Sequence, residues 1–226
     1  MEKIRAQLAD LAKITPKPKA VFFKTGKGDY AEHDQFIGVT VPDLRKLARE
    51  FAQLPFSQLQ ILLASKINEE RLLALIILVN QYPTNRAEVY QFYLNNLAQV
   101  NNWNLVDASA HLIIGAHLHN QDKAILSAFA KSEIMWERRI AIVATWYFIK
   151  NSEYTTTLEL AEILLNENHD LIHKAVGWML REVGKCDVDI LRGFLEKFSH
   201  KMPRTMLRYA IEKFSEHERM SYLTRV

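Results

Sequence analysis

From Thr40 to the C-terminus the sequence is a series of segments with helical hydrophobic spacing, separated by short breaks. Apolar residues recur at intervals of three and four within each segment, and Pro55, Pro83 and Pro203 stand in the breaks, where helices end. The chain has only seven glycines and six prolines among 226 residues, too few for a turn-rich β protein. The sequence therefore predicts an all-α fold.

The spacing places one amphipathic helix at 2–14, before Pro16 and Pro18, and a continuous series of helices after Thr40. The later helices are predicted at 42–53, 56–65, 68–81, 84–99, 102–118, 122–131, 133–150, 155–166, 169–184, 187–199, 203–214 and 216–224. Thr40 supplies a capping hydroxyl to the first of them, with Pro42 in its first turn.

The second helix of several successive pairs opens with a similar sequence. The openings are Glu-Arg-Leu-Leu-Ala at 70–74, Glu-Arg-Arg-Ile-Ala at 137–141 and His-Lys-Ala-Val-Gly at 173–177. The matching basic residues are spaced 68, 35 and 30 residues apart, at Arg71, Arg139, Lys174 and Arg204. We therefore predict one domain over 1–226, in which a helix and loop (1–41) precede HEAT-like antiparallel pairs (42–226). Such pairs stack into a curved α-solenoid whose second helices line the concave side.

This arrangement would place positive charge along the concave surface. The net charge of the chain is only +3, but residues 171–213 hold nine basic and five acidic side chains, a local balance of +4. A basic groove of this kind favours a polyanionic partner such as nucleic acid. The alternative is that each cation is paired with a neighbouring acid on a solvated helix face.

Trp103 and Asp107 form the first candidate site. At about 100° per residue they differ by about 40° on the predicted helix 102–118, and both lie about 120–160° from the centre of its apolar stripe. That stripe consists of Leu105, Val106, Leu112, Ile113 and Ala116. An aromatic ring and a carboxylate thus share a face that the core does not use, which indicates a binding or catalytic site; the alternative is a tryptophan that fills a groove between repeats.

Trp178 is displaced from the core of its helix in the same way. The apolar stripe of 169–184 consists of Ile172, Ala175, Val176, Met179, Leu180 and Val183. Trp178 lies about 120° from this stripe and shares its face with Lys174 and Arg181. An aromatic ring between two cations suits contact with a sugar or base beside phosphates, whereas Trp146 is assigned to packing.

Helix 133–150 has a fully apolar middle, which predicts burial on all sides. Arg138 and Arg139 stand near its start and need partners. Arg139 either reaches a phosphate or pairs with an acid on the same helix, Glu133 or Glu137. The residues alone leave both interpretations open.

Three segments carry a resemblance to the AlkD-type DNA alkylation-repair glycosylases. They are Trp103-x-x-x-Asp107, Trp-Glu-Arg-Arg-Ile-Ala at 136–141 and Lys-Ala-Val-Gly-Trp-Met-Leu-Arg-Glu at 174–182, and the similarity extends over 39–214. The resemblance implies a C-shaped solenoid that holds duplex DNA in a basic groove. It also implies excision of cationic N3- and N7-alkylpurines without a metal or organic cofactor.

The resemblance assigns a role to each candidate residue. Asp107 is similar to the catalytic carboxylate of the family, and Trp103 and Trp178 correspond to aromatic walls of its site. Arg139 corresponds to a phosphate contact. The basic residues that we also expect to contact DNA are Arg71, Arg138, Lys174, Arg181 and Arg204.

One segment departs from the family pattern. The active glycosylases place a further helix after the first one, near the DNA minor groove, but residues 21–39 have no helical period and contain three of the seven glycines. We predict an ordered loop held by Phe22, Phe23 and Phe36. Its charged side chains, among them Lys27 and Asp34, do not make it an obvious DNA probe.

The remaining features narrow the class of protein. The start of the chain lacks the apolar region of a secretory signal, and the longest apolar run, 140–149, has ten residues and is too short to span a bilayer. The single cysteine, Cys186, fits a reducing compartment, so we expect a cytoplasmic, bacterial-type protein that joins the nucleoid during repair. We expect a monomer that binds alkylated duplex DNA. Two other functions stay open: a non-catalytic binder of duplex or branched DNA, and a helical-repeat scaffold for a protein.

Overall fold

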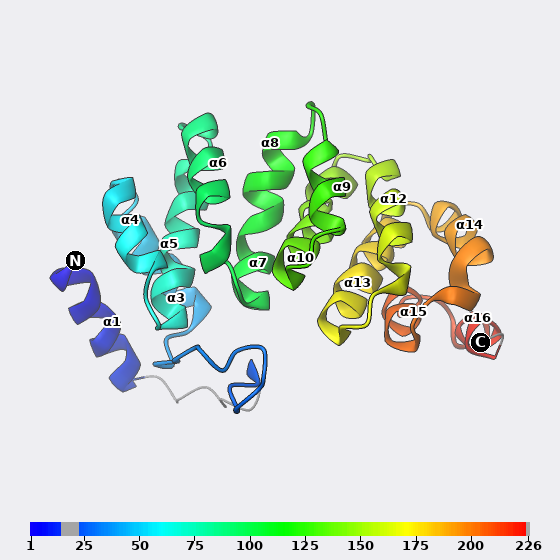
Figure 1. Ribbon diagram of the computed structural model, residues 1–226, viewed down its shortest axis with the longest axis horizontal. Helices are drawn as coiled ribbons and strands as arrows, with labels where there is room; N and C mark the ends of the chain where they lie inside the picture. Colours follow the sequence, from blue (N-terminus) through cyan, green and yellow to red (C-terminus); the bar gives the residue numbers. More distant parts are fainter. Residues whose placement is uncertain (15–22, 225–226) are drawn as a thin grey trace. The chain divides into compact units, whose positions relative to one another are not determined.

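The computed structural model describes residues 1–14 and 23–224, and these are predominantly helical (Figure 1). The helices are α1 (Glu2–Ile14), α3 (Val41–Glu50), α4 (Phe56–Leu63), α5 (Asn68–Gln81), α6 (Arg86–Asn95), α7 (Trp103–Ala110), α8 (Ala116–Leu118), α9 (Ala124–Ala130), α10 (Met135–Ala144), α11 (Trp146–Lys150), α12 (Thr155–Ile163), α13 (Asp170–Cys186), α14 (Val188–Phe198), α15 (Arg204–Ala210) and α16 (Glu216–Leu223). Short 3-10 turns follow α6, α12 and α14. The predicted all-α fold is confirmed, and each predicted helix has its counterpart. Within the described residues, no helix combines the length and apolarity needed to cross a membrane.

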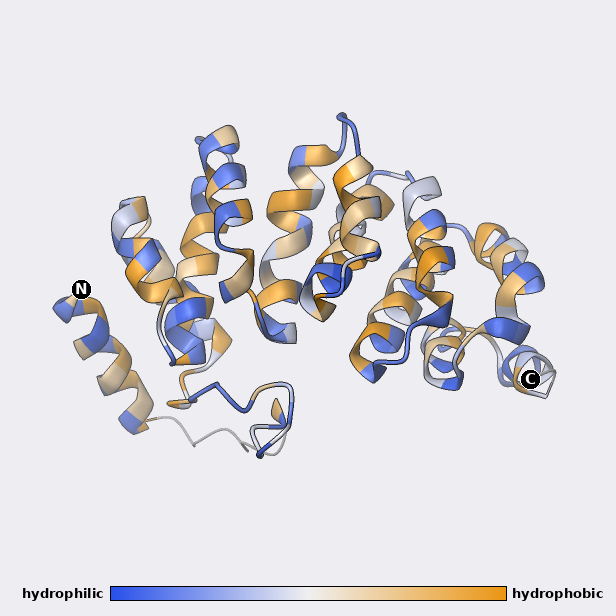
Figure 2. Ribbon diagram, in the orientation of Figure 1, coloured by the Kyte–Doolittle hydropathy of each residue, from blue (hydrophilic) through white to orange (hydrophobic). Residues whose placement is uncertain are grey.

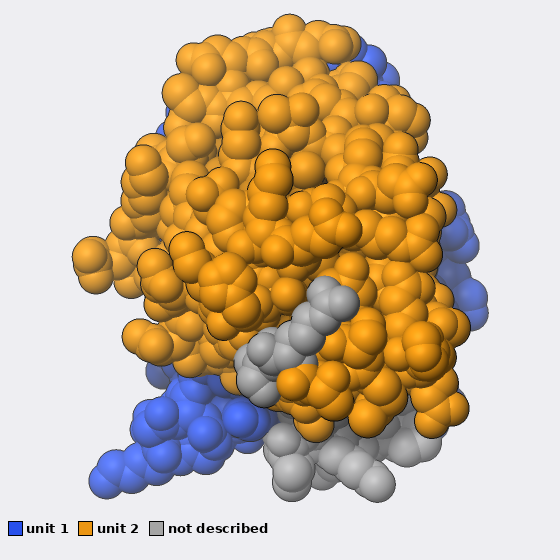
Figure 3. All heavy atoms as spheres, turned by 90° about the vertical axis from the view of Figure 1, so that its right-hand side faces the viewer, with its two compact units in different colours: residues 1–109 blue, residues 110–226 orange. Residues whose placement is uncertain are grey.

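The chain groups into two compact units, 1–109 and 110–226, which are coloured separately in Figure 3. In the first unit, α5 packs against α3 and α4 and also contacts α6. Thr40 caps α3 as predicted, because its Oγ1 accepts a hydrogen bond from the backbone N–H of Asp43 at 3.3 Å. Pro42 stands in the first turn, where a missing N–H costs nothing.

In the second unit the helices form two layers. The second helices of successive pairs contact one another in order, α10 against α13 and α13 against α15. Of the first helices, α9 packs on α10, while α12 and α14 both pack on α13. Stacked pairs of this kind are the packing of an α-solenoid.

The predicted apolar stripes form the cores of these layers. All six stripe residues of α13 are fully buried, and residues 140–144 of α10 are buried on every side, as predicted. Figure 2 shows the same division, with hydrophobic and hydrophilic positions alternating around the helices. Because each helix buries its stripe against a neighbour, the polar faces remain for other contacts.

The segment 103–118 departs from the predicted spacing in one respect. Residues His111–Gly115 form a π-helical segment between α7 and α8. The wider π turn shifts the phase of the helix, so Ile114 and Leu118 are buried where the regular spacing predicted Leu112 and Ala116. The stripe before the π segment, Leu105 and Val106, is buried as predicted.

Of the predicted loop 21–39, residues 24–39 have turns and no helix, as expected, whereas Phe23 is helical and 21–22 lie outside the described residues. The loop is fastened to the start of α5 by two backbone hydrogen bonds, from the Gln35 N–H to the Lys66 carbonyl at 2.9 Å and from the Asn68 N–H to the Gln35 carbonyl at 2.8 Å. The predicted packing of Phe22 lies outside the described residues.

Candidate functional site

A cavity of about 530 Å³ lies beside α7, within the first unit. Its lining combines the end of the loop, the start of α5 and the first turns of α7. The lining residues are Phe23, Phe36, Gly38, Val39, Thr40, Val41, Asn68, Glu69, Leu72, Trp103, Asn104, Asp107 and Ala108. Trp103 and Asp107 thus line one cavity from one face of α7, away from the buried Leu105 and Val106.

Aromatic rings from the loop cover one side of Trp103. The Phe23 ring stacks on Trp103 with 5.2 Å between ring centroids and 10° between planes. It also stacks on Phe36, at 4.2 Å and 25°. We call these three residues the aromatic row. Phe23 and Phe36 were predicted to hold the loop, and they do so against the candidate site itself.

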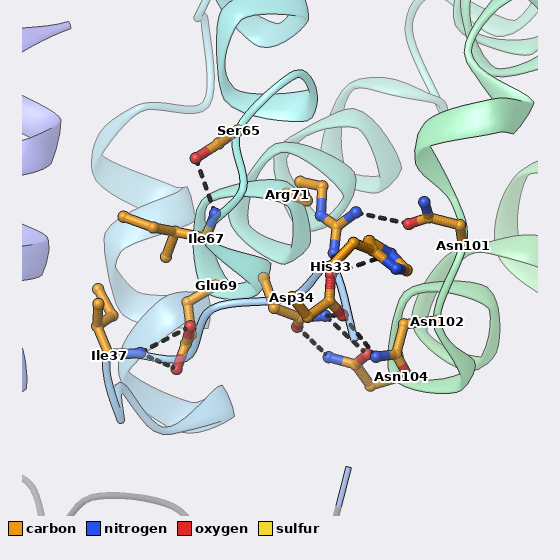
Figure 4. A network of polar contacts seen from close by, with 11 residues as sticks. His33, Asp34, Ile37, Ser65, Ile67, Glu69, Arg71, Asn101, Asn102 and Asn104 are labelled. Carbon is orange, nitrogen blue, oxygen red and sulfur yellow. Dashed lines mark hydrogen bonds and ion pairs between the residues drawn. The ribbon is translucent and has the colours of Figure 1, made fainter. Parts of the chain in front are cut away.

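A buried carboxylate fastens this loop to two helices (Figure 4). The side chain of Asp34 has no exposed area and is paired with Arg71 of α5, whose side chain is 2% exposed. Asp34 also accepts hydrogen bonds from the side-chain amides of Asn68, at 2.9 Å, and Asn102, at 2.6 Å. Arg71 donates in addition to Asn101 Oδ1 at 2.5 Å. Loop, α5 and the residues before α7 are therefore joined through one charged pair.

Glu69, which lines the cavity, holds the end of the loop through hydrogen bonds. Its carboxylate accepts hydrogen bonds from the backbone N–H groups of Gly38, at 2.8 Å, and Ile37, at 3.1 Å. Gly38 has a φ of 97°, a conformation that favours glycine. Burial raises the pKa of Glu69, and the backbone N–H donors oppose that rise.

The charge of Asp107 acts on a neighbouring buried phenol. Burial raises the pKa of Tyr93, a hydrogen bond with Ser109 opposes this, and the negative charge of Asp107 raises the pKa further. The Tyr93 hydroxyl lies 3.0 Å from Ser109 Oγ, which in turn donates to the Leu105 carbonyl at 2.6 Å. Tyr93 is thus a neutral, fixed support beneath α7 and not a base.

In the second unit, Trp178 is half-buried on α13, outside the fully buried stripe, as its spacing predicted. Its ring meets the edge of Trp146 at 4.9 Å between centroids and 62° between planes. Its Nε1–H donates to Glu182 Oε1 at 3.2 Å. Trp146 therefore packs against the candidate residue. Its ring also lies 4.5 Å from the His111 ring, centroid to centroid, and 4.0 Å from the ammonium of Lys150.

The two predicted cations beside Trp178 on α13 have acidic partners. Lys174 pairs with Asp170 at 2.6 Å, and Arg181 pairs with Glu212 and lies 3.7 Å from Glu182. This is the ion-pair alternative left open by the sequence. Because Lys174 is 39% exposed, water screens its pair, and exposed pairs contribute only about 0–1 kcal/mol. Such a cation can exchange its partner for a phosphate at little cost.

Arg138 and Arg139 reach across to the next helix pair. Arg138 pairs with Glu167 at 2.5 Å and donates to the Ser132 carbonyl at 2.6 Å. Although burial raises the pKa of Glu167, the backbone N–H groups of the next two residues and the Arg138 charge hold it below its usual value. Arg139 is 5% exposed and donates to the Leu171 carbonyl. The Arg138–Glu167 pair and the Arg139–Leu171 hydrogen bond each connect α10 to the next helix pair.

Two of the expected DNA contacts, Arg71 and Arg204, differ in burial. Arg71 is buried and its guanidinium bonds to Asp34 and Asn101, so a DNA contact by this side chain, which stays a prediction, would require rearrangement of these bonds. Arg71 and Arg139 occupy the same position in the repeat, and each makes hydrogen bonds to other groups of the protein. Arg204 is exposed at the start of α15 and donates to the Leu223 carbonyl at 2.5 Å.

Comparison with known proteins identifies the family of this chain. The family model described as DNA alkylation repair enzyme matches residues 4–214. This protein belongs to the DNA alkylation repair enzyme family. The resemblance inferred from the three sequence segments is thereby confirmed, and DNA repair is the role that this membership supports.

The fold has a counterpart among solved structures. The structure titled "Predicted DNA alkylation repair enzyme from Enterococcus faecalis" is similar with a TM-score of 0.69 and 17% sequence identity, over 83% of this chain and 92% of that one. No curated protein matches the sequence significantly. At this identity the structural likeness supports the fold, while family membership rests on the sequence match.

Sequence reasoning missed three contributors to the candidate site of this family member: Asp34, Glu69 and the stacking of Phe23 on Trp103. Asp34 lies in a loop segment with several other charged residues, and nothing near it in the sequence indicates that it is buried. Glu69 carried a usable signal, since it opens a helix beside a loop with glycine at position 38. Among the described residues, no group of three or more His, Cys, Asp or Glu side chains is arranged to hold a metal ion.

Proposed function

We propose that this protein hydrolyses the N-glycosidic bond of cationic N3- and N7-alkylpurines in duplex DNA. The observation that carries the proposal is the placement of Trp103 and Asp107 on one cavity wall in a member of the DNA alkylation repair enzyme family. A purine alkylated at either position is already positively charged and leaves without protonation by a general acid. Histidine and cysteine are therefore not required for this reaction.

The reaction also requires stabilisation of the sugar cation, and we assign this role to Asp107. As the base leaves, the sugar becomes an oxocarbenium-like cation, which a nearby carboxylate stabilises until water adds to it. The aromatic face of Trp103, on the same cavity wall, attracts the same charge, at about 0.5–2 kcal/mol for such a contact. In this proposal Asp107 is the catalytic carboxylate.

The basic side chains of the second unit hold the DNA backbone. Arg204 is exposed, Lys174 is 39% exposed in its pair with Asp170, and Arg181 pairs with the exposed Glu212. Arg138 and Arg139 are more buried, and their proposed phosphate contacts require rearrangement of their present hydrogen bonds. The proposal therefore predicts binding that weakens as salt rises, with log K falling linearly against log salt concentration.

The test is release of free base from a duplex that contains N7-methylguanine. Wild-type protein should release 7-methylguanine, and Asp107→Asn should slow release by about 10²–10³-fold, the usual cost of removing one electrostatic contact to a transition state. Asp107→Asn keeps the size of the side chain, and equal DNA binding by both proteins controls for folding. Equal rates in the two proteins, or no release by either, would exclude this mechanism.

A second candidate is binding of duplex or branched DNA without excision. It is favoured by the stacking of Phe23 on Trp103, which already occupies one face of the proposed aromatic wall. Salt-dependent binding by wild type with no base release would identify this function. Lys174→Ala should then reduce the salt slope by about one phosphate contact.

A further inference from the structure

A groove lies between α12 and α14 of the second unit (Figure 1). Both helices pack on α13, and α12 also packs on α9, but α12 and α14 pack only weakly on each other. The space between them has a volume of about 380 Å³. The cations of this unit that we expect to contact DNA lie on the second helices α10, α13 and α15, and none of them lines the groove.

The wall that α14 contributes is apolar. Ile190, Phe194 and Phe198 line the groove at intervals of four residues, so they form a single ridge along this helix. Leu158 lines it from α12. Gly193 widens the middle, because a Cβ added there would have no other group within 4 Å. Two helices with an open space between their ridges form the kind of surface into which the side chains of a third helix pack.

The wall that α12 contributes is acidic. Glu159 and Glu162 line it, both are exposed, and within the described residues neither forms an ion pair. Lys197 is the one cation of the described lining, so the groove carries a charge of −1 in a chain whose net charge is +3. Such a wall repels a phosphate backbone and attracts basic side chains.

We propose that this groove binds a helical segment of a partner protein that has an apolar ridge with lysine or arginine beside it. The ridge enters between Leu158 and Phe194, and the basic side chains pair with Glu159 and Glu162. The α12 wall spans residues 155–162, about 10 Å of helix, so about two turns of the partner fill it. The groove contains none of the residues assigned to base release or to DNA contact, so binding here does not depend on the proposed function.

The test measures the binding of two designed peptides by fluorescence anisotropy. One labelled peptide of about 14 residues carries leucines at helical intervals of three and four, with lysines beside them. The other has glutamate in place of each lysine. Wild-type protein should bind the lysine peptide saturably and at least about tenfold more tightly than the glutamate peptide, because like charges placed together across an interface are costly. Equal affinity for the two peptides would overturn the proposal.

A charge reversal tests whether the acidic wall sets this preference. Glu159→Lys combined with Glu162→Lys should make the glutamate peptide the tighter ligand. The matched control is Glu133→Lys combined with Glu196→Lys, which changes the net charge equally at two exposed positions outside the groove. The control should still prefer the lysine peptide. If it shifts the preference as far as the groove variant does, binding follows net charge and the proposal fails.

Gly193→Leu tests the apolar part of the groove. The new side chain has room at its Cβ and favours the helix, so the variant should keep its Tm. It fills the groove, and should therefore weaken binding of the lysine peptide at least about tenfold. Unchanged affinity in this folded variant would overturn the proposal. Sedimentation velocity tests a second copy of the chain as the occupant: a wild-type dimer that dissociates in Gly193→Leu would overturn the assignment to a different partner protein.

Discussion

Replacing Arg71 with methionine should release the loop 24–40 from the first unit. The side chains of Arg71 and Asp34 are 2% and 0% exposed, so neither charge has water as an alternative partner. Burial lowers the pKa of Arg71, and the charge and hydrogen bond of Asp34 oppose that change. Methionine fills much of the same volume but leaves the Asp34 carboxylate without its cation.

The expected cost is set by the stranded carboxylate. Removing one member of a buried pair costs about 3–5 kcal/mol. Asn68 and Asn102 still donate to Asp34, and His33 Nε2 lies 3.3 Å from it, so we expect the lower end, about 3 kcal/mol. For a chain of this size that corresponds to a loss of about 6–12 °C in Tm.

The assay combines thermal unfolding with hydrogen exchange. The Asn68 N–H, bonded to the Gln35 carbonyl at 2.8 Å, should exchange faster in the variant, because that bond holds the loop to α5. Lys46→Met is the control: Lys46 pairs with Asp43 at 3.2 Å and is 67% exposed, so its loss should cost less than about 1 kcal/mol.

A double variant tests the physical reason. Asp34→Asn combined with Arg71→Met removes both charges, and should recover a large part of the stability lost in Arg71→Met. If Arg71→Met destabilises no more than Lys46→Met, or if the double variant is the sum of its parts, the buried pair does not fasten the loop.

Two further predictions concern packing and pH. In Gly115→Ala the new Cβ would meet the Ala144 carbonyl oxygen, so we expect a loss of about 1–3 kcal/mol in thermal unfolding, whereas Gly193→Ala meets nothing within 4 Å and should gain about 0.5–1 kcal/mol. The folded-state pKa of Glu69 is raised above its usual 4.5, so the folded protein holds this proton more tightly than the unfolded chain does. Stability from this group is therefore present at low pH and lost as pH rises through the raised pKa. Urea unfolding of wild type between about pH 4 and about pH 7 should show this decline relative to Glu69→Gln, and parallel curves would refute it.

Most of the secondary structure, and the face that each helix buries, could be predicted from the sequence. The buried stripe of α13 and the exclusion of Trp178 from it follow from spacing alone, because side-chain direction repeats regularly along a helix. The same rule placed Trp103 and Asp107 together on the face opposite Leu105. It failed where the helix itself changed, at the π segment 111–115, because a wider turn alters the spacing on which the rule depends.

Candidate contacts far apart in sequence were decided only by tertiary structure. Nothing around Asp34 in the sequence predicts a buried anion, because its partner Arg71 is 37 residues away and Asn102 is 68 residues away. For the same reason Arg71 could be read as a DNA contact. Its position in the repeat indicated a basic residue, but only packing shows whether such a residue meets solvent or an acid.

Trp103 and Asp107 on α7 show which features follow from the sequence and which depend on the tertiary structure. Local helical geometry, which the sequence encodes directly, determined that Trp103 and Asp107 share a face outside the core. The closing of a cavity over that face depends on Phe23, Phe36 and the loop fastened by Asp34, which come from elsewhere in the chain. Periodicity describes neighbours within a helix, whereas a cavity is made of groups that only folding brings together.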